Sequence, residues 1–232
     1  MSFTPFHIAI DGPEAAGKGT VSKLSAEKLG FLYVDTGAMY RMTAYLGHTT
    51  GVAYEDETGL AELIRKSKME LRNPTPEEKD GRLITVLLNG DDVSWQIRTP
   101  EIGQGSSKVA VHPLVRKELV IKQQEIAAHQ NVVMEGRDIT FRVLPDAQLK
   151  IFLTASDVVR AQRRFQQQQT KGVSTTLEEV YQNLLERDKR DRERSTDPLH
   201  IVPDAWVLDT SELAIEDVVD LIVAKVKAMR HE

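Results

Sequence analysis

The chain alternates short, mostly apolar runs with longer stretches in which apolar residues recur every three or four positions. The short runs predict strands that are buried on both faces of a parallel sheet. They lie at His7–Ile10, Phe31–Val34, Asn131–Met134, Leu149–Leu153 and Trp206–Leu208. The longer stretches predict helices. We therefore expect an α/β fold of three layers around a central five-stranded parallel sheet, with right-handed crossovers.

Three helices are marked by signals of their own. Apolar residues between Ile215 and Val226 form one stripe at helical spacing. Thr175 and Thr176, each with a Glu three positions on, resemble capping boxes that open a helix at about position 177. Pro113 fits the first turn of a helix that runs to about position 129.

The alternation stops between about Lys68 and Ile102. Two turn signals, Asp80-Gly81 and Asn89-Gly90, bracket the β-rich run Arg82–Leu88. Asn-Gly between extended runs is the strongest short-range hairpin signal. We predict a small antiparallel sheet inserted into the parallel core; an elaborated surface loop is the alternative.

Composition narrows the function. The 232 residues carry 30 Lys and Arg against 35 Asp and Glu, a net charge of −5, which argues against a general nucleic-acid binder. The absence of cysteine excludes disulfides and thiolate zinc sites, and the scattered histidines suggest no metal site. No basic, apolar leader or membrane-spanning run is visible. We expect one domain, cytoplasmic and monomeric, without a membrane or nucleic-acid partner.

A glycine-rich segment directly follows the first predicted strand and opens the first helix. Glycines let the backbone wrap closely around a polyphosphate, and the helix N-terminus adds positive partial charge. The lysine of such a P-loop reaches the β- and γ-phosphates. The alternative is a glycine-rich turn without a ligand. The segment reads Gly12-Pro13-Glu14-Ala15-Ala16-Gly17-Lys18-Gly19-Thr20.

The end of this segment separates two classes of P-loop protein. Gly19 follows the lysine where Ser or Thr is usual, and the hydroxyl comes one residue later, at Thr20. The order Gly-Lys-Gly-Thr resembles the nucleoside monophosphate kinases. A GTPase is disfavoured because no asparagine is followed by lysine, so the guanine-reading Asn-Lys-x-Asp motif is absent.

A kinase that transfers a phosphoryl group between two nucleotides must bring two polyanions together. It therefore needs arginines beyond those of its phosphate loop. Two candidate segments follow predicted strands, where ligands bind in parallel sheets. They are Asp35-Thr36-Gly37-Ala38-Met39-Tyr40-Arg41 and Glu135-Gly136-Arg137-Asp138. For the first, a simple helix cap with a surface arginine is an equal alternative.

A third candidate is the charged run Glu186–Arg194, whose ordinary interpretation is a solvated helix face. Val180 and Leu184 lie on the apolar stripe of this helix, and the same spacing continues to three charged residues, which therefore need partners. These are Arg187, Asp191 and Arg194. Lys189, Arg190 and Arg192 do not lie on this stripe and are expected to face solvent.

The preceding predicted helix, Ser156–Gln169, carries Arg160, Arg163 and Arg164 and leads into the polar stretch Thr170–Thr175. Two arginine-bearing helices joined by a polar loop suit a lid that closes over a donor nucleotide and excludes water. Spacing does not decide which of the three arginines contacts the donor.

With these segments together, the chain resembles the bacterial cytidylate kinases over essentially its full length. The matching stretches are Asp11–Thr20, Asp35–Arg41, the insertion ending Asn89-Gly90-Asp91-Asp92-Val93 and Ile97-Arg98-Thr99-Pro100-Glu101, Glu135–Asp138 and Glu186–Arg194. The inserted β-sheet is the most specific, because adenylate kinases do not enlarge the monophosphate-binding region there. The resemblance implies a P-loop kinase domain over 1–232, with a core (1–67, 103–156, 173–232), a monophosphate-binding insertion (68–102) and a lid (157–172).

The resemblance also implies an activity: direct in-line transfer of the γ-phosphate of Mg·ATP to CMP or dCMP in pyrimidine nucleotide metabolism. Charge on the transferring group would be stabilised by Lys18, Arg137, Arg187 and Arg194. The donor would be held by residues 12–20 and Arg164. The acceptor would be held by Thr36, Arg41, Ser107, Arg116, Arg137, Asp138, Arg187, Asp191 and Arg194, with Ser107, Arg116 and Asp138 reading the cytosine edge.

Three positions depart from the family pattern. Ala15 stands where glycine is usual, Thr36 replaces a serine but keeps the hydroxyl, and Ile139-Thr140-Phe141 replaces the usual Ile/Met-Gly-Thr. The last departure makes the role of Asp138 the least secure. Mg²⁺ is expected to be held mainly by phosphates and water, with Thr20 contributing. Two alternatives remain: a P-loop kinase for another small acceptor, and an ATP-binding regulatory module without turnover.

Overall fold

The computed structural model describes residues 4–78, 80–170 and 172–231. Positions 1–3, 79, 171 and 232, which the predicted core, insertion and lid include, lie outside the described residues. The chain divides into two compact units. One comprises residues 1–7 and 30–134, and the other comprises residues 8–29 and 135–232.

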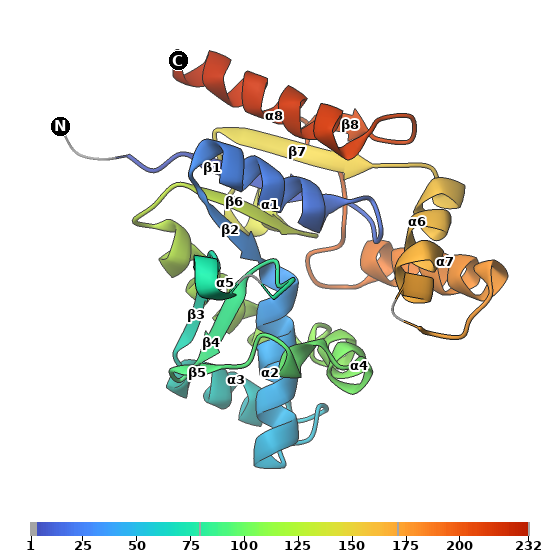
Figure 1. The fold of residues 1–232 in the computed structure, drawn as a ribbon. Helices are drawn as coiled ribbons and strands as arrows, with labels where there is room; N and C mark the ends of the chain where they lie inside the picture. The colour runs from blue at the N-terminus through green and yellow to red at the C-terminus, as the bar shows by residue number, and fades with distance from the viewer. Residues whose placement is uncertain (1–3, 79, 171, 232) are drawn as a thin grey trace. The chain divides into compact units, whose positions relative to one another are not determined.

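Five of the strands form a parallel sheet, as predicted (Figure 1). Its hydrogen-bonded order is β2-β6-β1-β7-β8, and in two pairs Ile8 lies opposite Leu149 and Ile151 opposite Trp206. Each strand begins at the predicted residue or one residue later. The bounds are β1 (His7–Asp11), β2 (Leu32–Asp35), β6 (Val132–Gly136), β7 (Leu149–Thr154) and β8 (Trp206–Asp209).

The prediction that all five strands are buried on both faces is wrong for β8. Leu208 is buried, but Val207 is 48% exposed. The reason is position, since β8 ends the strand order of the sheet, whereas β1 lies inside it with Ile8, Ala9 and Ile10 fully buried.

In the unit of residues 8–29 and 135–232, the helices pack in pairs: α1 against α8, and α6 against α7 (Figure 1). The predicted stripe on α8 is buried from Val218 to Val226, although Ile215, at the helix start, is 41% exposed. Thr176 and Glu179 form the predicted capping box of α7. The helices are α1 (Lys18–Leu29), α6 (Asp157–Thr170), α7 (Leu177–Glu193) and α8 (Ile215–Arg230), with one π-turn at Ile139–Val143.

In the unit of residues 1–7 and 30–134, α2 packs against α4 and α3 against α5. Asp35 caps α2 by accepting from Ala38 N at 3.1 Å, and Asp56 caps α3 by accepting from Gly59 N at 2.9 Å. The helices are α2 (Thr36–Thr50), α3 (Glu57–Lys66), α4 (Pro100–Val109) and α5 (Pro113–Ala127), with 3-10 turns η1 (Pro76–Glu78) and η2 (Gln96–Arg98).

The predicted antiparallel insertion is confirmed as a three-stranded sheet in the order β3-β4-β5. Asn89 and Gly90 connect β4 to β5 with φ of 54° and 96°, the left-handed pair that a two-residue type I′ hairpin requires. The strands are β3 (Met69–Arg72), β4 (Thr85–Leu88) and β5 (Asp91–Asp92), so β4 is shorter than the β-rich run that predicted it.

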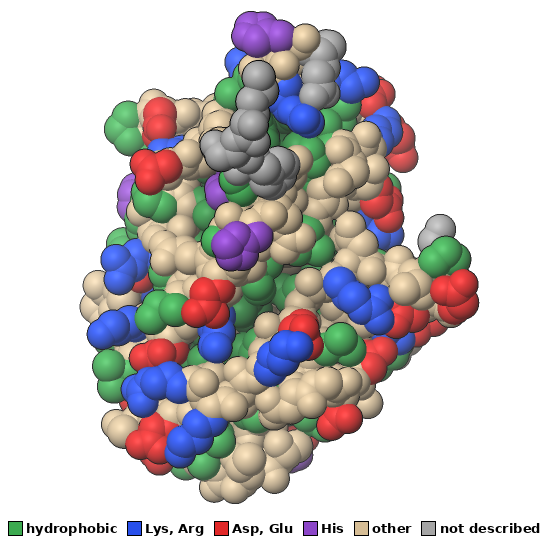
Figure 2. All heavy atoms as spheres, turned by 90° about the vertical axis from the view of Figure 1, so that its left-hand side faces the viewer, with side chains coloured by type: hydrophobic (Ala, Val, Ile, Leu, Met, Phe, Trp, Pro, Cys, Tyr) green, Lys and Arg blue, Asp and Glu red, His purple; other side chains and the backbone are tan. Residues whose placement is uncertain are grey.

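Helices in the described part of the chain are all too short or too polar to cross a membrane. On the face shown in Figure 2, basic and acidic side chains are interspersed. Because the net charge is −5, any anion must be bound by a local cluster of basic groups.

Candidate active site

The glycine-rich segment forms a tight loop between β1 and α1. Gly12 and Gly17 have φ of 154° and 91°. A Cβ on Gly12 would lie 2.0 Å from the Leu153 carbonyl oxygen of β7, so only glycine fits there. Ala15 also adopts a left-handed conformation, with φ of 57°, which costs a non-glycine residue about 1–2 kcal/mol. Of these three positions, only Ala15 therefore adopts a backbone conformation that its residue type does not favour.

Lys18 is the first residue of α1 and is only 5% exposed. Its Nζ donates to the Pro13 carbonyl at 2.7 Å, so the ammonium group closes the loop on itself. Burial, followed by the nearby charge of Arg137, lowers the pKa of Lys18 from its ordinary 10.5 to about 7, although Glu135, Asp191 and Asp11 oppose the shift. A buried ammonium with this pKa lacks a sufficient anionic partner.

Glu14 lies at the centre of a charged network that joins the loop to α6 and α7. Its Oε1 accepts from Arg187 Nη1 at 2.8 Å and lies 3.9 Å from Arg164 Nη2. Its carbonyl accepts from Arg160 Nη1 at 2.9 Å, and its amide lies 3.4 Å from Asp188 Oδ1. Both arginine-bearing helices therefore contact the same loop residue.

Arg160 fixes the first turn of α6. Its guanidinium is 1% exposed and pairs with Asp188 at 2.6 Å and Asp157 at 2.5 Å, while Nε donates to the Ala155 carbonyl at 3.1 Å. Asp188 is itself only 4% exposed. A buried arginine and aspartate that satisfy each other form a rigid joint between the two helices.

Arg137 and Asp191 form a second pair, at 2.7 Å from Nε to Oδ2. Burial alone would raise the pKa of Asp191, but the charge of Arg137 and its hydrogen bond, with Arg187 and Arg194, outweigh that effect and lower it. Arg194 Nη2 lies 4.0 Å from Asp138 Oδ1. Five of the predicted charged residues are thus brought together in one unit.

The position of Arg194 corrects one detail of the sequence analysis. Because α7 ends at Glu193, Arg194 lies past the helix, with ψ of 143°. It enters the cluster through the turn that follows, where its Nε donates to the Asp197 carbonyl at 2.8 Å. Asp191, by contrast, lies on the helix as predicted.

The loop that departs from the family pattern is anchored by Asp11. This fully buried carboxylate accepts from the amides of Ile139 and Thr140 at 2.9 and 2.8 Å, and from the Thr140 hydroxyl at 2.6 Å. Burial raises the pKa of Asp11, although the hydrogen bonds from Thr140 oppose the rise. The threonine that replaces glycine is therefore one of the anchors of the backbone next to Asp138.

In the other unit, two arginines share the carboxylate that caps α2. Asp35 Oδ2 lies 3.9 Å from Arg41 Nη1 and 3.7 Å from Arg98 Nη2. Arg98 Nη2 is buried and has no hydrogen-bond partner within the described ranges. Thr36 is buried at the start of the same helix. Two guanidinium groups beside one carboxylate leave a net positive charge, which suits an anion.

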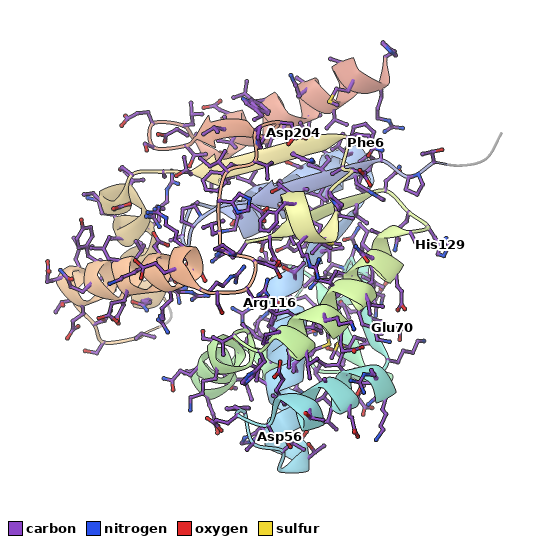
Figure 3. The ribbon with its side chains drawn as sticks, turned by 180° about the vertical axis from the view of Figure 1, so that it is seen from behind. Phe6, Asp56, Glu70, Arg116, His129 and Asp204 are labelled. Carbon is purple, nitrogen blue, oxygen red and sulfur yellow. The ribbon has the colours of Figure 1, made fainter. Side chains whose placement is uncertain are left out.

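Arg116 and Ser107 lie on α5 and α4 of this unit. Arg116, labelled in Figure 3, is 2% exposed, and its guanidinium carbon lies 5.8 Å from the centre of the Tyr40 ring of α2. Ser107 is half-buried two residues after Gly105, where a Cβ would lie 2.7 Å from the Tyr54 ring. The helices that carry Ser107 and Arg116 both pack on α2, the helix that carries Thr36 and Arg41.

A cavity of about 310 Å³ opens beside the phosphate loop, a size typical of small-molecule sites. Its walls come from residues 15–17 with Thr20, from α6, and from the segment between β8 and α8. Arg163 lines it and donates to the Thr210 hydroxyl and carbonyl at 3.0 and 2.7 Å. Arg164, the predicted donor contact, is not among the lining residues.

Three pairings at the site were not predicted from the sequence: Arg160 with Asp188, Arg98 with Asp35, and the carboxylate of Glu14 with Arg187. A signal for Asp188 was present, because Val180, Leu184 and Asp188 follow one another at four-residue spacing. For Arg98 and Glu14 no spacing signal exists, since their partners come from distant segments. Within 4–78, 80–170 and 172–231, no three His, Asp or Glu side chains gather as metal ligands.

Comparisons with known proteins identify relatives along almost the whole chain. A family model described as cytidylate kinase matches residues 8–228. The chain is 46% identical over 222 residues to a cytidylate kinase of Bacillus cereus, covering 96% of each, and 47% identical over 216 residues to one of Bacillus anthracis, covering 93% of each. A solved structure of an uncharacterized protein from Eubacterium ventriosum matches with a TM-score of 0.53 at 11% identity, covering 96% of this chain and 98% of that one, which indicates a shared fold.

Proposed function

The chain belongs to the cytidylate kinase family, and on this premise we propose that it transfers the γ-phosphoryl group of ATP to CMP or dCMP, giving ADP and CDP or dCDP. The observation that carries the proposal is the buried Lys18 in a glycine-shaped loop. Burial and the charge of Arg137 lower the pKa of this ammonium to about 7, because the nearby carboxylates only partly offset them. A polyphosphate supplies the missing charge.

The residues around the loop fit a nucleoside triphosphate with Mg²⁺. The loop amides, Lys18 and the N-terminus of α1 suit the phosphates, and the cavity beside them, with Arg163 and Thr210 on its wall, suits the base and sugar. Thr20 would supply a hydroxyl for Mg²⁺, and the ion when bound would neutralise charge on the phosphates. We keep Arg164 as a proposed phosphate contact and add Arg163 as a proposed contact of the nucleoside.

The roles proposed for the acceptor-binding residues are given for each unit in turn. Within residues 30–134 we propose that Arg41 binds phosphate with Thr36, and that Ser107 and Arg116 read the base. Within residues 135–232 we propose that Asp191 holds the ribose. In the same unit, the phosphate would be bound by Arg137 and Arg194, Arg187 would contact phosphate and ribose, and Asp138 would read the base. Because a mispaired base leaves buried polar groups unsatisfied, at about 1–3 kcal/mol each, cytosine is preferred over uracil.

The transfer requires no general base. The acceptor phosphate is a dianion near neutral pH, so one of its oxygens attacks the γ-phosphorus directly. The bond from that phosphorus to the β,γ-bridging oxygen breaks, and its electrons leave with ADP. Lys18, Arg137, Arg187 and Arg194 stabilise the charge that spreads over the transferring group.

We also propose that residues 157–172 act as a lid. The Arg160–Asp188 pair links the start of α6 to α7, so we propose that closure involves the part of α6 beyond Arg160. That part carries Arg163 and Arg164. Closing it over the donor excludes water, which would otherwise accept the phosphoryl group.

An acceptor panel tests the function. ADP formation from Mg·ATP is compared for CMP, dCMP, UMP, AMP and GMP at equal low concentration. We expect strong turnover with CMP and dCMP, weak turnover with UMP and none with the purines. Equal rates with UMP would contradict the base-reading roles of Ser107, Arg116 and Asp138. Binding of ATP without transfer to any acceptor would favour a regulatory module instead.

A second prediction concerns protons. Lys18 has a pKa of about 7 in the nucleotide-free protein, and an adjacent polyphosphate favours its charged form and so raises that pKa. At pH 8 the free lysine is largely deprotonated, so binding Mg·ATP should take up protons. Above pH 7 the affinity should therefore fall as pH rises.

The uptake is measured by titration calorimetry at pH 8 in two buffers of different ionisation enthalpy. Lys18→Met is the matched control, because it keeps the apolar stem without the titrating group. An equal uptake in Lys18→Met and wild type would assign the proton to another group.

A further inference from the structure

Glu14 places a carboxylate inside a loop that is otherwise built for anions. Its side chain is only 16% exposed, so its charge is not simply solvated. The backbone on either side is also fixed, since Arg160 binds its carbonyl at 2.9 Å and Asp188 lies 3.4 Å from its amide. The carboxylate is therefore held within the phosphate loop, against the arginines of the two neighbouring helices.

The partners of this carboxylate are arginines of the two helices beside the loop. A single oxygen, Oε1, accepts from Arg187 at 2.8 Å and faces Arg164 at 3.9 Å. Arg187 is a proposed contact of the transferring group, and Arg164 is a proposed contact of the donor. Carboxylate and phosphate oxygens offer a guanidinium the same kind of charged hydrogen bond.

We propose that Glu14 is an internal anion that occupies Arg187 in the nucleotide-free enzyme and is displaced from it by the donor polyphosphate, so that Glu14 sets the affinity for Mg·ATP. The proposal rests on the proposed function, since it takes Mg·ATP to be the ligand of the loop. Glu14 acts here as a positioning residue, because it works through Arg187 and not on the substrate.

The consequence for affinity follows from charge. Binding the donor must separate the Glu14–Arg187 pair, and the released carboxylate stays near the incoming phosphates because its backbone is fixed. Both effects oppose binding. A neutral side chain of the same shape removes both while it leaves the loop backbone, Lys18 and the arginines in place. The half-exposed Arg187, at 37%, limits the effect through solvent screening.

The test compares Glu14→Gln, Glu14→Asp and wild type. We expect Glu14→Gln to bind Mg·ATP about three- to tenfold more tightly by calorimetry, with a matching fall in KM for ATP and a smaller change in kcat. Glu14→Asp keeps the charge and should stay within twofold of wild type. The difference between Glu14→Gln and wild type should shrink at high salt.

Glu186→Gln is the matched control, because it removes one negative charge from an exposed position of α7; it should leave Mg·ATP affinity unchanged. Unchanged or weaker binding by Glu14→Gln would overturn the proposal and assign Glu14 a purely structural role. An equal gain in Glu186→Gln would also overturn it, since overall charge would then be the cause. Because the readout is binding, it stays decisive even if CMP proves not to be the acceptor, which the ADP assay reports separately.

Discussion

Replacing Gly12 with alanine is expected to disrupt the phosphate loop and to remove about 3–5 kcal/mol from the free energy of unfolding. The added Cβ would lie 2.0 Å from the Leu153 carbonyl oxygen, which belongs to a strand inside the sheet and cannot move away cheaply. The φ of 154° adds strain for any side chain. Either β1 and β7 separate locally or the loop changes its conformation, so Mg·ATP binding is also lost.

Urea unfolding and calorimetry with Mg·ATP measure the two effects. Gly30→Ala is the control, because Gly30 also has a left-handed φ, 68°, but a Cβ there meets nothing within 4 Å. It should cost about 1–2 kcal/mol, the conformational term alone. If Gly12→Ala is no less stable than Gly30→Ala, the close approach to Leu153 does not constrain the loop.

Replacing Lys18 with methionine is expected to separate activity from stability. The value of kcat/KM with Mg·ATP and CMP should fall about 10²–10³-fold, or about 2.7–4 kcal/mol, because a preorganised cation is removed from the transferring phosphate. The nucleotide-free protein should be at least as stable as wild type, because a poorly compensated buried ammonium is replaced by an apolar chain of similar length.

The pH dependence gives a further readout. The folded pKa of Lys18, about 7, is below its ordinary 10.5, so between these values the unfolded chain holds more protons than the folded protein. The free energy of unfolding of the wild type should therefore increase as pH rises between these two values, and this increase should be absent in Lys18→Met. Lys23→Met, on the same helix and paired with Glu27, is the control and should keep the activity. A loss of stability in Lys18→Met would show that Lys18 holds the loop chiefly through its bond to Pro13.

Local chemistry in the sequence determined most of the fold. Four of the five apolar runs became strands with buried centres, because short, mostly apolar runs suit strands of a sheet that is covered on both faces. Asn89-Gly90 determined the hairpin, since this pair accepts the two left-handed conformations at low cost. Thr176 and Glu179 likewise determined the start of α7 through contacts only three residues apart.

The candidate site was only partly determined in this way. The phosphate loop and Lys18 are contiguous in sequence, so their pattern was sufficient to predict them. The spacing that continues the apolar stripe of α7 also predicted that Arg187 and Asp191 face charged partners, as they do. It did not select Asp188, whose carboxylate is more buried than either because Arg160 lies opposite it.

Only the tertiary structure decided which charges pair. Glu14 and Arg187 are 173 positions apart, and Asp11 and Thr140 are 129 apart. Helical periodicity gives the direction of a side chain but not what lies opposite it, and a buried charge is stable only where a distant segment supplies a counter-charge. For the same reason the sequence could not show that Arg163 lines the cavity while Arg164 faces Glu14. The phosphate loop is therefore a property of the sequence, whereas the arrangement of the arginines around it is a property of the fold.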